Sequence, residues 1–137
     1  MKGTRIFYGC TALTSISLPE LESIEKSAFY GCSNLASVSL PKVTNVGQQA
    51  FGSCSSLTTI CLPKDTNMRP TDLNYLRSVT TLFLCNDSND ALATEEDIAK
   101  WTDVVTQLTT VFYDYQGEDG DYLDPNNYDQ VWTRPSN

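Results

Sequence analysis

The sequence predicts an α/β repeat solenoid: a right-handed coil whose turns stack into a parallel sheet of short strands, with a C-terminal helix and an irregular acidic cap. Two observations predict it, a repeat of 22 residues and an alternating apolar pattern that ends in proline inside each regular copy. Six positions keep the 22-residue step over three copies: Phe7, Phe29 and Phe51; Cys10, Cys32 and Cys54; Leu13, Leu35 and Leu57; Ile16, Val38 and Ile60; Leu18, Leu40 and Leu62; Pro19, Pro41 and Pro63. Such a period is typical of solenoids, in which each coil buries its apolar residues against its neighbours.

Each coil is expected to contain one short strand. Ile16 and Leu18 point to one side of an extended chain and Ser17 to the other, and Pro19 then ends the strand because it cannot donate to a ladder. The rest of the coil returns the chain, so that equivalent strands lie side by side and parallel. The return path carries apolar residues at spacings of three and four, which predicts a short helical or 3₁₀ turn against the back of the sheet: Leu21, Ile24, Ala28 and Phe29.

Two degenerate copies follow the three regular ones. "LTTICL" at 57–62 reappears as "VTTLFL" at 79–84, and "LTTVFY" at 108–113 comes 29 residues later instead of 22, which predicts an insertion of seven residues in one turn. The expected organisation has three parts: residues 1–85, with three regular copies from a truncated first coil and a degenerate fourth; residues 86–113, an insertion with a helix and the last repeat strand; and residues 114–137, an acidic aromatic tail.

A helix is expected from about residue 95 to 106. Thr94 followed three residues later by Asp97 resembles a capping box, and Glu95 and Glu96 add negative charge in the first turn, where the helix dipole favours it. Apolar residues at helical spacing, Trp101 among them, are expected to pack on the last coils.

The composition excludes several classes of function. The chain has a net charge of −8, only nine Lys and Arg residues and no histidine. It therefore lacks the commonest general base and metal ligand, and it cannot assemble a basic face for nucleic acid or an acidic membrane. No stretch approaches the roughly 20 apolar residues of a membrane span, and the first ten residues contain no signal-peptide core. Either the protein stays inside the cell or its export signal is not in this chain. The charge is uneven, at +2 for residues 1–85 and −10 for residues 86–137.

The strings "SAFYGCSNLASVSLP" and "QAFGSCSSLTTICLP" resemble the BspA-type leucine-rich repeat, whose units read approximately I-x-x-x-A-F-x-x-C-x-x-L-x-x-I-x-L-P. The resemblance covers residues 3–63 well and residues 64–113 weakly. It implies a leucine-rich-repeat coil in a bacterial surface or secreted protein, extracellular or on the cell surface, that adheres to host proteins or other cells.

The five cysteines are expected to be free thiols. A zinc site would need closer pairs and usually histidine. Cys10, Cys32 and Cys54 form a stacked column, in which buried thiols acting as small apolar residues are favoured over disulfides because parallel side chains keep their Cβ atoms apart. Cys61 and Cys85 are expected about 8 Å apart on a diagonal, too far for a bridge. Thiol reagents are expected to label Cys61 or Cys85 well before Cys32.

The outward face of the sheet is the expected binding surface. It carries small hydroxyl side chains, with two aromatic residues toward the C-terminus, and such open faces are the usual contact surfaces of solenoids. A peptide or a sugar ring would suit it, whereas the alternative is that the insertion or the acidic tail folds back over Phe83 and Phe112. The candidate ligand-binding residues are Thr59, Cys61, Thr81, Phe83, Thr110 and Phe112.

The sequence favours a non-catalytic module whose partner is a host or bacterial protein or a glycan, with no nucleic acid, no cofactor and no metal. Asp119, Asp121 and Asp124 cluster in the tail, but no stretch there fits a twelve-residue calcium loop. The chain begins partway through a coil, with Lys2 in an apolar column. The alternative function is therefore a spacer or oligomerisation element that stacks through its uncapped N-terminal coil, giving a homo-oligomer.

Overall fold

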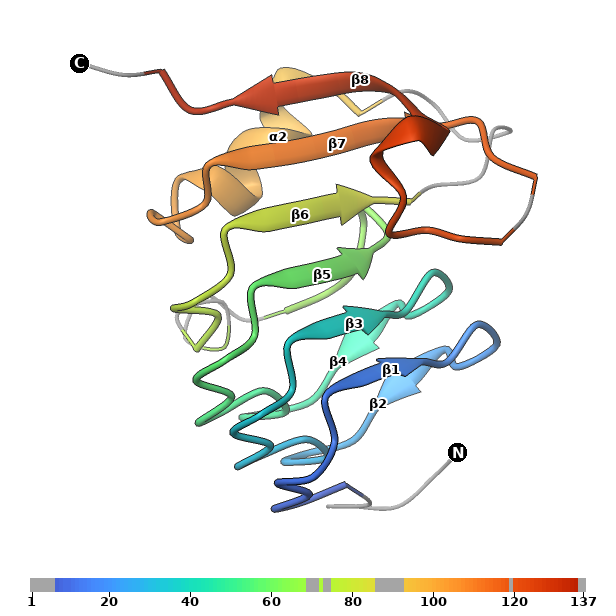
Figure 1. Ribbon diagram of the computed structural model, residues 1–137. Helices are drawn as coiled ribbons and strands as arrows, with labels where there is room; N and C mark the ends of the chain where they lie inside the picture. Colours follow the sequence, from blue (N-terminus) through green and yellow to red (C-terminus); the bar gives the residue numbers. More distant parts are fainter. Residues whose placement is uncertain (1–6, 69–71, 73–74, 86–92, 119, 136–137) are drawn as a thin grey trace.

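The computed structural model describes residues 7–68, 72, 75–85, 93–118 and 120–135. Its main element is a six-stranded sheet in the order β1-β3-β5-β6-β7-β8, with one stacked coil after another along the sheet (Figure 1). A second sheet of two short strands, β2 and β4, lies on the other arm of the first coils. The elements are β1 (Ser15–Ser17), β2 (Ser23–Ile24), β3 (Ser37–Ser39), β4 (Asn45–Val46), β5 (Thr59–Leu62), β6 (Thr81–Leu84), α2 (Glu95–Thr102), β7 (Thr110–Tyr115), η1 (Pro125–Asn127) and β8 (Tyr128–Thr133).

Neighbouring strands pair in the register of the repeat. Ser15 lies opposite Ser37, Ser37 opposite Thr59, and Thr59 opposite Thr81, which are steps of 22 residues in parallel strands. Thr81 lies opposite Thr110, a step of 29, so the additional residues are accommodated between β6 and β7 without disturbing the pairing. α2 lies in that longer connection.

The core lies on the inward side of the main sheet. Val38, Ile60, Leu82 and Val111 occupy one column of the four central strands, and none is more than 1% exposed. Behind them Phe7, Phe29 and Phe51 stack with ring centroids 5.1 and 5.5 Å apart and planes within 5°. Burial of these side chains between coils is the main stabilising contribution, at roughly 25 cal/mol for each Å² of apolar surface.

The return arm differs from the expected helical or 3₁₀ turn. It contains the strands β2 and β4 followed by a run of turns, in which Ser27 and Gln49 adopt φ values of 58° and 57°. A left-handed residue interrupts a helix, and the Ser27 N–H donates to the Gln48 carbonyl of the next coil at 2.9 Å instead of to its own segment. The next N–H, that of Ala28, donates locally to the Glu25 carbonyl at 3.2 Å, so single turns alternate with coil-to-coil hydrogen bonds and no continuous helical turn forms here. Ala28 and Phe29 are buried against the sheet as expected.

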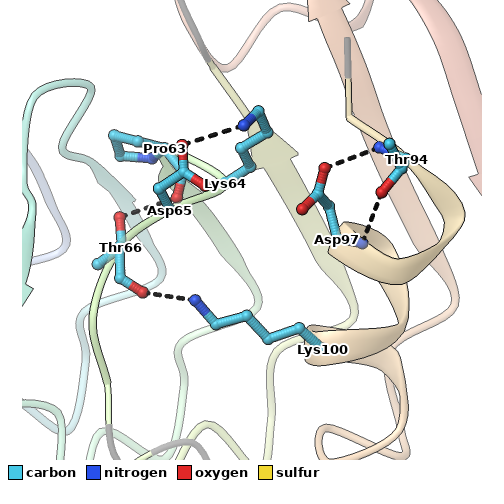
Figure 2. Close-up of polar contacts among 7 residues, drawn as sticks. All are labelled: Pro63, Lys64, Asp65, Thr66, Thr94, Asp97 and Lys100. Atoms are coloured by element: carbon cyan, nitrogen blue, oxygen red, sulfur yellow. Dashed lines mark hydrogen bonds and ion pairs between the residues drawn. The ribbon is translucent and has the colours of Figure 1, made fainter. Parts of the chain in front are cut away.

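α2 begins with the capping box and ends four residues earlier than expected. The Thr94 hydroxyl accepts from the Asp97 N–H at 3.2 Å, and the Asp97 carboxylate accepts from the Thr94 N–H at 2.8 Å (Figure 2). This second hydrogen bond is the main reason that the pKa of Asp97 lies below its ordinary value. Lys100 donates to the Thr66 carbonyl at 2.8 Å and so ties α2 to the third coil (Figure 2), while Trp101 is buried in the core. No helix among the described residues is long and apolar enough to cross a membrane.

The described residues of the C-terminal tail extend the sheet by one further strand. β7 runs through Tyr115, so the expected boundary at residue 114 falls inside a strand, and β8 pairs with β7 antiparallel. The connection between them, which contains η1, turns down beside the ends of β5 and β6 (Figure 1). Trp101 of α2 packs in the core on the inward face of the sheet, whereas residues of this connection pack against the outward face. The two faces are therefore covered by different segments.

Candidate functional site

The outward face of the sheet carries two columns of small hydroxyl residues that remain accessible. We call these residues the hydroxyl strip: Ser15, Ser37, Thr59, Thr81 and Thr110 in one column, and Thr14, Thr58, Thr80 and Thr109 in the next. Thr14, Ser15, Thr58 and Thr109 are exposed, and the other members are half-buried. Of the predicted binding residues, Thr59, Thr81 and Thr110 therefore lie on an accessible surface.

Hydrogen bonds hold the hydroxyl strip in place. The Thr109 hydroxyl donates to the Thr80 carbonyl of the preceding coil at 3.2 Å and lies 3.3 Å from the Thr110 hydroxyl. The Thr58 hydroxyl makes the equivalent pair of contacts, to the Ala36 carbonyl at 3.4 Å and the Thr59 hydroxyl at 3.5 Å. Because threonine is also restricted at χ1, the strip presents ordered donors and acceptors that lose little entropy when a partner binds.

The neighbouring outward column is covered toward the C-terminus, which corrects part of the predicted binding surface. Ser17 is exposed, but Ser39 is 5%, Cys61 0% and Phe83 2% exposed, and Phe112 is half-buried. Cys61, Phe83 and Phe112 meet side chains of the β7–β8 hairpin in what we call the covered cluster: Cys61, Phe83, Cys85, Phe112, Tyr115, Tyr122, Leu123 and Tyr128. The alternative considered from the sequence, in which the tail folds back over Phe83 and Phe112, is the arrangement found, so Cys61 and Phe83 cannot contact a ligand while the hairpin is in place.

Aromatic packing accounts for the position of the hairpin. Phe83 stacks on Phe112 with centroids 4.9 Å apart, and Tyr128 lies 5.2 Å from Phe83 and 5.2 Å from Tyr115. The Tyr128 hydroxyl donates to the Tyr122 carbonyl at 2.7 Å, and burial raises the pKa of Tyr128 far above its ordinary value. The small residues at these outward positions in the first coils have become Cys and Phe, which gives the hairpin an apolar surface to cover.

Two acidic residues of the hairpin, Asp121 and Asp124, accept hydrogen bonds within turns. The Asp121 carboxylate accepts from the Leu123 N–H at 3.1 Å, and the Asp124 carboxylate accepts from the Asn126 N–H at 2.9 Å. Asp119, the third member of the candidate calcium cluster, lies outside the described residues. Within the described ranges no group of three His, Cys, Asp or Glu side chains is arranged to hold a metal ion.

The column of Cys10, Cys32 and Cys54 forms a ladder of free thiols that also make hydrogen bonds. The Cys32 thiol donates to the Phe7 carbonyl at 3.0 Å, and the Cys54 thiol donates to the Phe29 carbonyl at 3.1 Å. Burial raises the pKa of both thiols, that of Cys54 to about 12. The thiols therefore fill space as predicted and also satisfy a carbonyl of the preceding coil, a contact that the repeat pattern did not reveal.

Cys61 and Cys85 are free thiols, as predicted, but their surroundings differ from the prediction. Both are buried under the hairpin, at 0% and 3% exposed. Burial raises the pKa of Cys85 well above its ordinary value. Early labelling of Cys61 or Cys85 is therefore no longer expected, because a reagent can reach these two residues only after the hairpin opens.

A comparison with known protein families agrees with the repeat. A family model described as a BspA type leucine rich repeat region, with six copies, matches residues 3–90. A crystal structure of the leucine rich repeat protein TpLRR of T. pallidum is similar at 24% identity and a TM-score of 0.37. The similar region covers 59% of this chain and 50% of that protein, so the chain spans about half the length of its structural relative. No curated protein matches the chain.

Proposed function

Because the chain belongs to the BspA-type leucine-rich repeat family, we propose that it is a non-catalytic binding module of a bacterial surface or secreted protein. In this proposal the hydroxyl strip binds a protein or a glycan and so mediates adhesion. The observation that carries it is the accessible, ordered line of Ser and Thr hydroxyls across the parallel strands β1 to β7, next to an outward column that is covered.

The physical chemistry of the strip suits recognition and not catalysis. Successive hydroxyls lie about 4.8 Å apart across the strands, which offers a partner many donors and acceptors of the same kind at regular spacing. The chain contains no histidine, so a Ser–His or Cys–His pair is not available. The buried cysteines have raised pKa values, which disfavours the thiolate form that a nucleophile requires.

The experiment that tests this function is an array of immobilised host matrix proteins, bacterial surface proteins and glycans, probed with the intact chain. Arginines introduced by Thr59→Arg and Thr81→Arg would obstruct the strip. The matched control is Asn45→Arg with Asn67→Arg, two exposed residues that lie 22 apart on the opposite arm and so add the same charge.

We expect the strip variant to lose about tenfold or more of its affinity for each probe that the wild type binds, and the control to retain it. Binding by the strip variant equal to that of the wild type would refute the strip as the contact surface. A wild-type chain that binds no probe of any class would contradict the adhesive function itself.

A second function, assembly by stacking of coils, has its own observation. At the β1 edge Leu13, Ile16 and Leu18 are only half-buried, whereas their equivalents one coil later, Leu35, Val38 and Leu40, are fully buried. A further coil placed against β1 would bury this apolar edge. Light scattering over a range of concentrations tests it: association that Ile16→Lys abolishes supports stacking, and a monomer at every concentration contradicts it.

A further inference from the structure

A second candidate binding site lies on the turns at one side of the solenoid, where the repeat changes. The turn reads FYGC at 7–10 and at 29–32 but FGSC at 51–54. Tyr8 and Tyr30 stack with centroids 5.4 Å apart. At the third coil the tyrosine ladder ends because residue 52 is glycine, whose Cα lies so close to Tyr30 that a Cβ would be 2.6 Å from the ring.

The next residue of the same turn, Ser53, also departs from the repeat. Gly9 and Gly31 occupy the equivalent position with φ values of 69° and 79°, and Ser53 keeps this left-handed conformation at 58°. A residue with a Cβ is strained there by about 1 kcal/mol or more, whereas glycine is not. Ser53 is exposed, so its side chain contributes little packing that would offset this strain.

Ser53 borders a pocket of about 360 Å³ between the third and fourth coils, lined by Ser53, Cys54, Ser55, Tyr75, Arg77 and Ser78. The pocket lies at the lower end of the volumes of small-molecule sites, about 300–1,000 Å³.

The lining has a definite chemistry. Arg77 supplies a guanidinium, whose planar fork of donors matches the geometry of a carboxylate or sulfate. Tyr75 supplies an aromatic ring, and its hydroxyl accepts from the Gln49 side chain at 3.2 Å, which restrains it. The three serines supply hydroxyls, and Ser78 is fixed by donation to the Leu57 carbonyl at 2.5 Å.

We propose that this pocket binds one acidic sugar residue, with its carboxylate or sulfate on Arg77, its ring against Tyr75 and its hydroxyls near Ser53 and Ser55. An acidic peptide would also pair with Arg77 but would leave the serines with little to bind, which is why the sugar is favoured. The chain carries a net charge of −8, so it has no general attraction for anions, and binding of an acidic sugar would report local contacts.

The test is calorimetric titration of the intact chain with four probes: sialyllactose, a sulfated heparin disaccharide, neutral lactose, and a short peptide of Asp and Glu. We expect one or both acidic sugars to bind at least about tenfold more tightly than lactose, which has no acid group for Arg77, and than the peptide, which has no sugar ring for Tyr75. The stronger of the two acidic sugars identifies the acid group as carboxylate or sulfate.

Variants locate the binding. Arg77→Gln should weaken it about tenfold or more, and Arg77→Lys should restore only part of the loss. Ser53→Gly should raise the melting temperature by relieving the left-handed strain and yet weaken binding, an opposite pair of effects that a structural role alone would not produce. Lys26→Gln removes an equal charge from an exposed position outside the pocket and should leave binding unchanged.

Several outcomes would overturn the proposal: no binding of either acidic sugar at millimolar concentration, equal binding of lactose, tighter binding of the acidic peptide, or wild-type affinity in Arg77→Gln. Loss of binding in Lys26→Gln to the same extent as in Arg77→Gln would also overturn it, because the attraction would then be general. None of these results depends on the hydroxyl strip, whose variants Thr59→Arg and Thr81→Arg separate failure of this site from failure of the proposed function.

Discussion

Replacing Arg134 with alanine should loosen the C-terminal end of the molecule. The Arg134 guanidinium donates to the Leu108 carbonyl at 2.8 Å, the Thr102 carbonyl at 2.9 Å and the Val105 carbonyl at 3.5 Å, so it ties the segment after β8 to the carbonyls at and beyond the end of α2. It also lies 5.3 Å from the Trp132 ring centroid. A cation at this end of a helix is favoured by the dipole as well.

Hydrogen bonds to a charged group contribute about 1.5–3 kcal/mol each when water is excluded. Arg134 is exposed, so water competes, and we expect about 1–2 kcal/mol for the whole side chain. For a domain of this size that corresponds to a melting temperature lower by roughly 3–8 °C, with a matching decrease in the urea midpoint.

Two comparisons make the test of Arg134 specific. Arg134→Lys keeps the charge but lacks the fork of donors, and it should recover less than half of the lost free energy of unfolding. Lys26→Ala, at an exposed position without such contacts, should change it by no more than about 0.5 kcal/mol. An unchanged urea midpoint in Arg134→Ala would refute the reasoning, and complete recovery by lysine would show that charge alone is responsible.

Three further predictions concern the hairpin, the coil contacts and the thiol ladder. Tyr128→Phe removes one hydrogen bond of the covered cluster, worth about 1 kcal/mol, and should accelerate thiol labelling of Cys85 about fivefold. Tyr128→Ala removes the whole ring and should accelerate this labelling more than about a hundredfold. Unchanged labelling rates in both variants would contradict the role of Tyr128. Gly47→Ala places a Cβ 2.6 Å from the backbone nitrogen of Lys26 in the preceding coil. This clash should lower the free energy of unfolding, measured by urea titration, by about 1–3 kcal/mol, and an unchanged value would show that the coils separate easily. Folding raises the pKa of Cys54 from 9.0 to about 12, so unfolding releases a proton between these pH values. The stability that this thiol contributes is therefore complete below pH 9, and above it the free energy of unfolding should fall by up to about 1.4 kcal/mol per pH unit. The free energy of unfolding of Cys54→Val should depend less steeply on pH, and equal slopes would argue against a buried thiol.

The repeating part of the fold could be predicted from the sequence because its determinants are local and periodic. Val38 and Ile60 occupy equivalent positions in equivalent coils, so one period places both in the core and in register. The capping box at Thr94 and Asp97 placed the start of α2 in the same way, by residues three apart. The end of α2 at Thr102 could not be placed from neighbouring residues alone. Carbonyls at and beyond that end are bound by Arg134, which lies 32 residues from Thr102 along the chain.

The covered cluster could not be predicted with the same certainty, because it depends on a segment outside the repeat. Phe83 stands in the column of Ser17 and Ser39, and nothing in that column shows whether Tyr122 and Tyr128 lie on top of it. The sequence left exposure and cover as equal alternatives for this reason. The prediction of a helical turn in the return arm was wrong for a related reason. The spacing of Ala28 and Phe29 shows that both are buried, but it does not show that the Ser27 N–H donates a hydrogen bond to the next coil.

The division of the outward face into an accessible hydroxyl strip and a covered cluster is the central claim, and native-state thiol labelling tests it most directly. Wild-type chain is treated with a thiol reagent, and the labelling of each of the five cysteines is followed by peptide mass spectrometry. We expect half-buried Cys10 to react first, and Cys32, Cys54, Cys61 and Cys85 to react much more slowly. Labelling of Cys61 or Cys85 as fast as that of Cys10 would contradict the account, because the hairpin would then not cover the sheet.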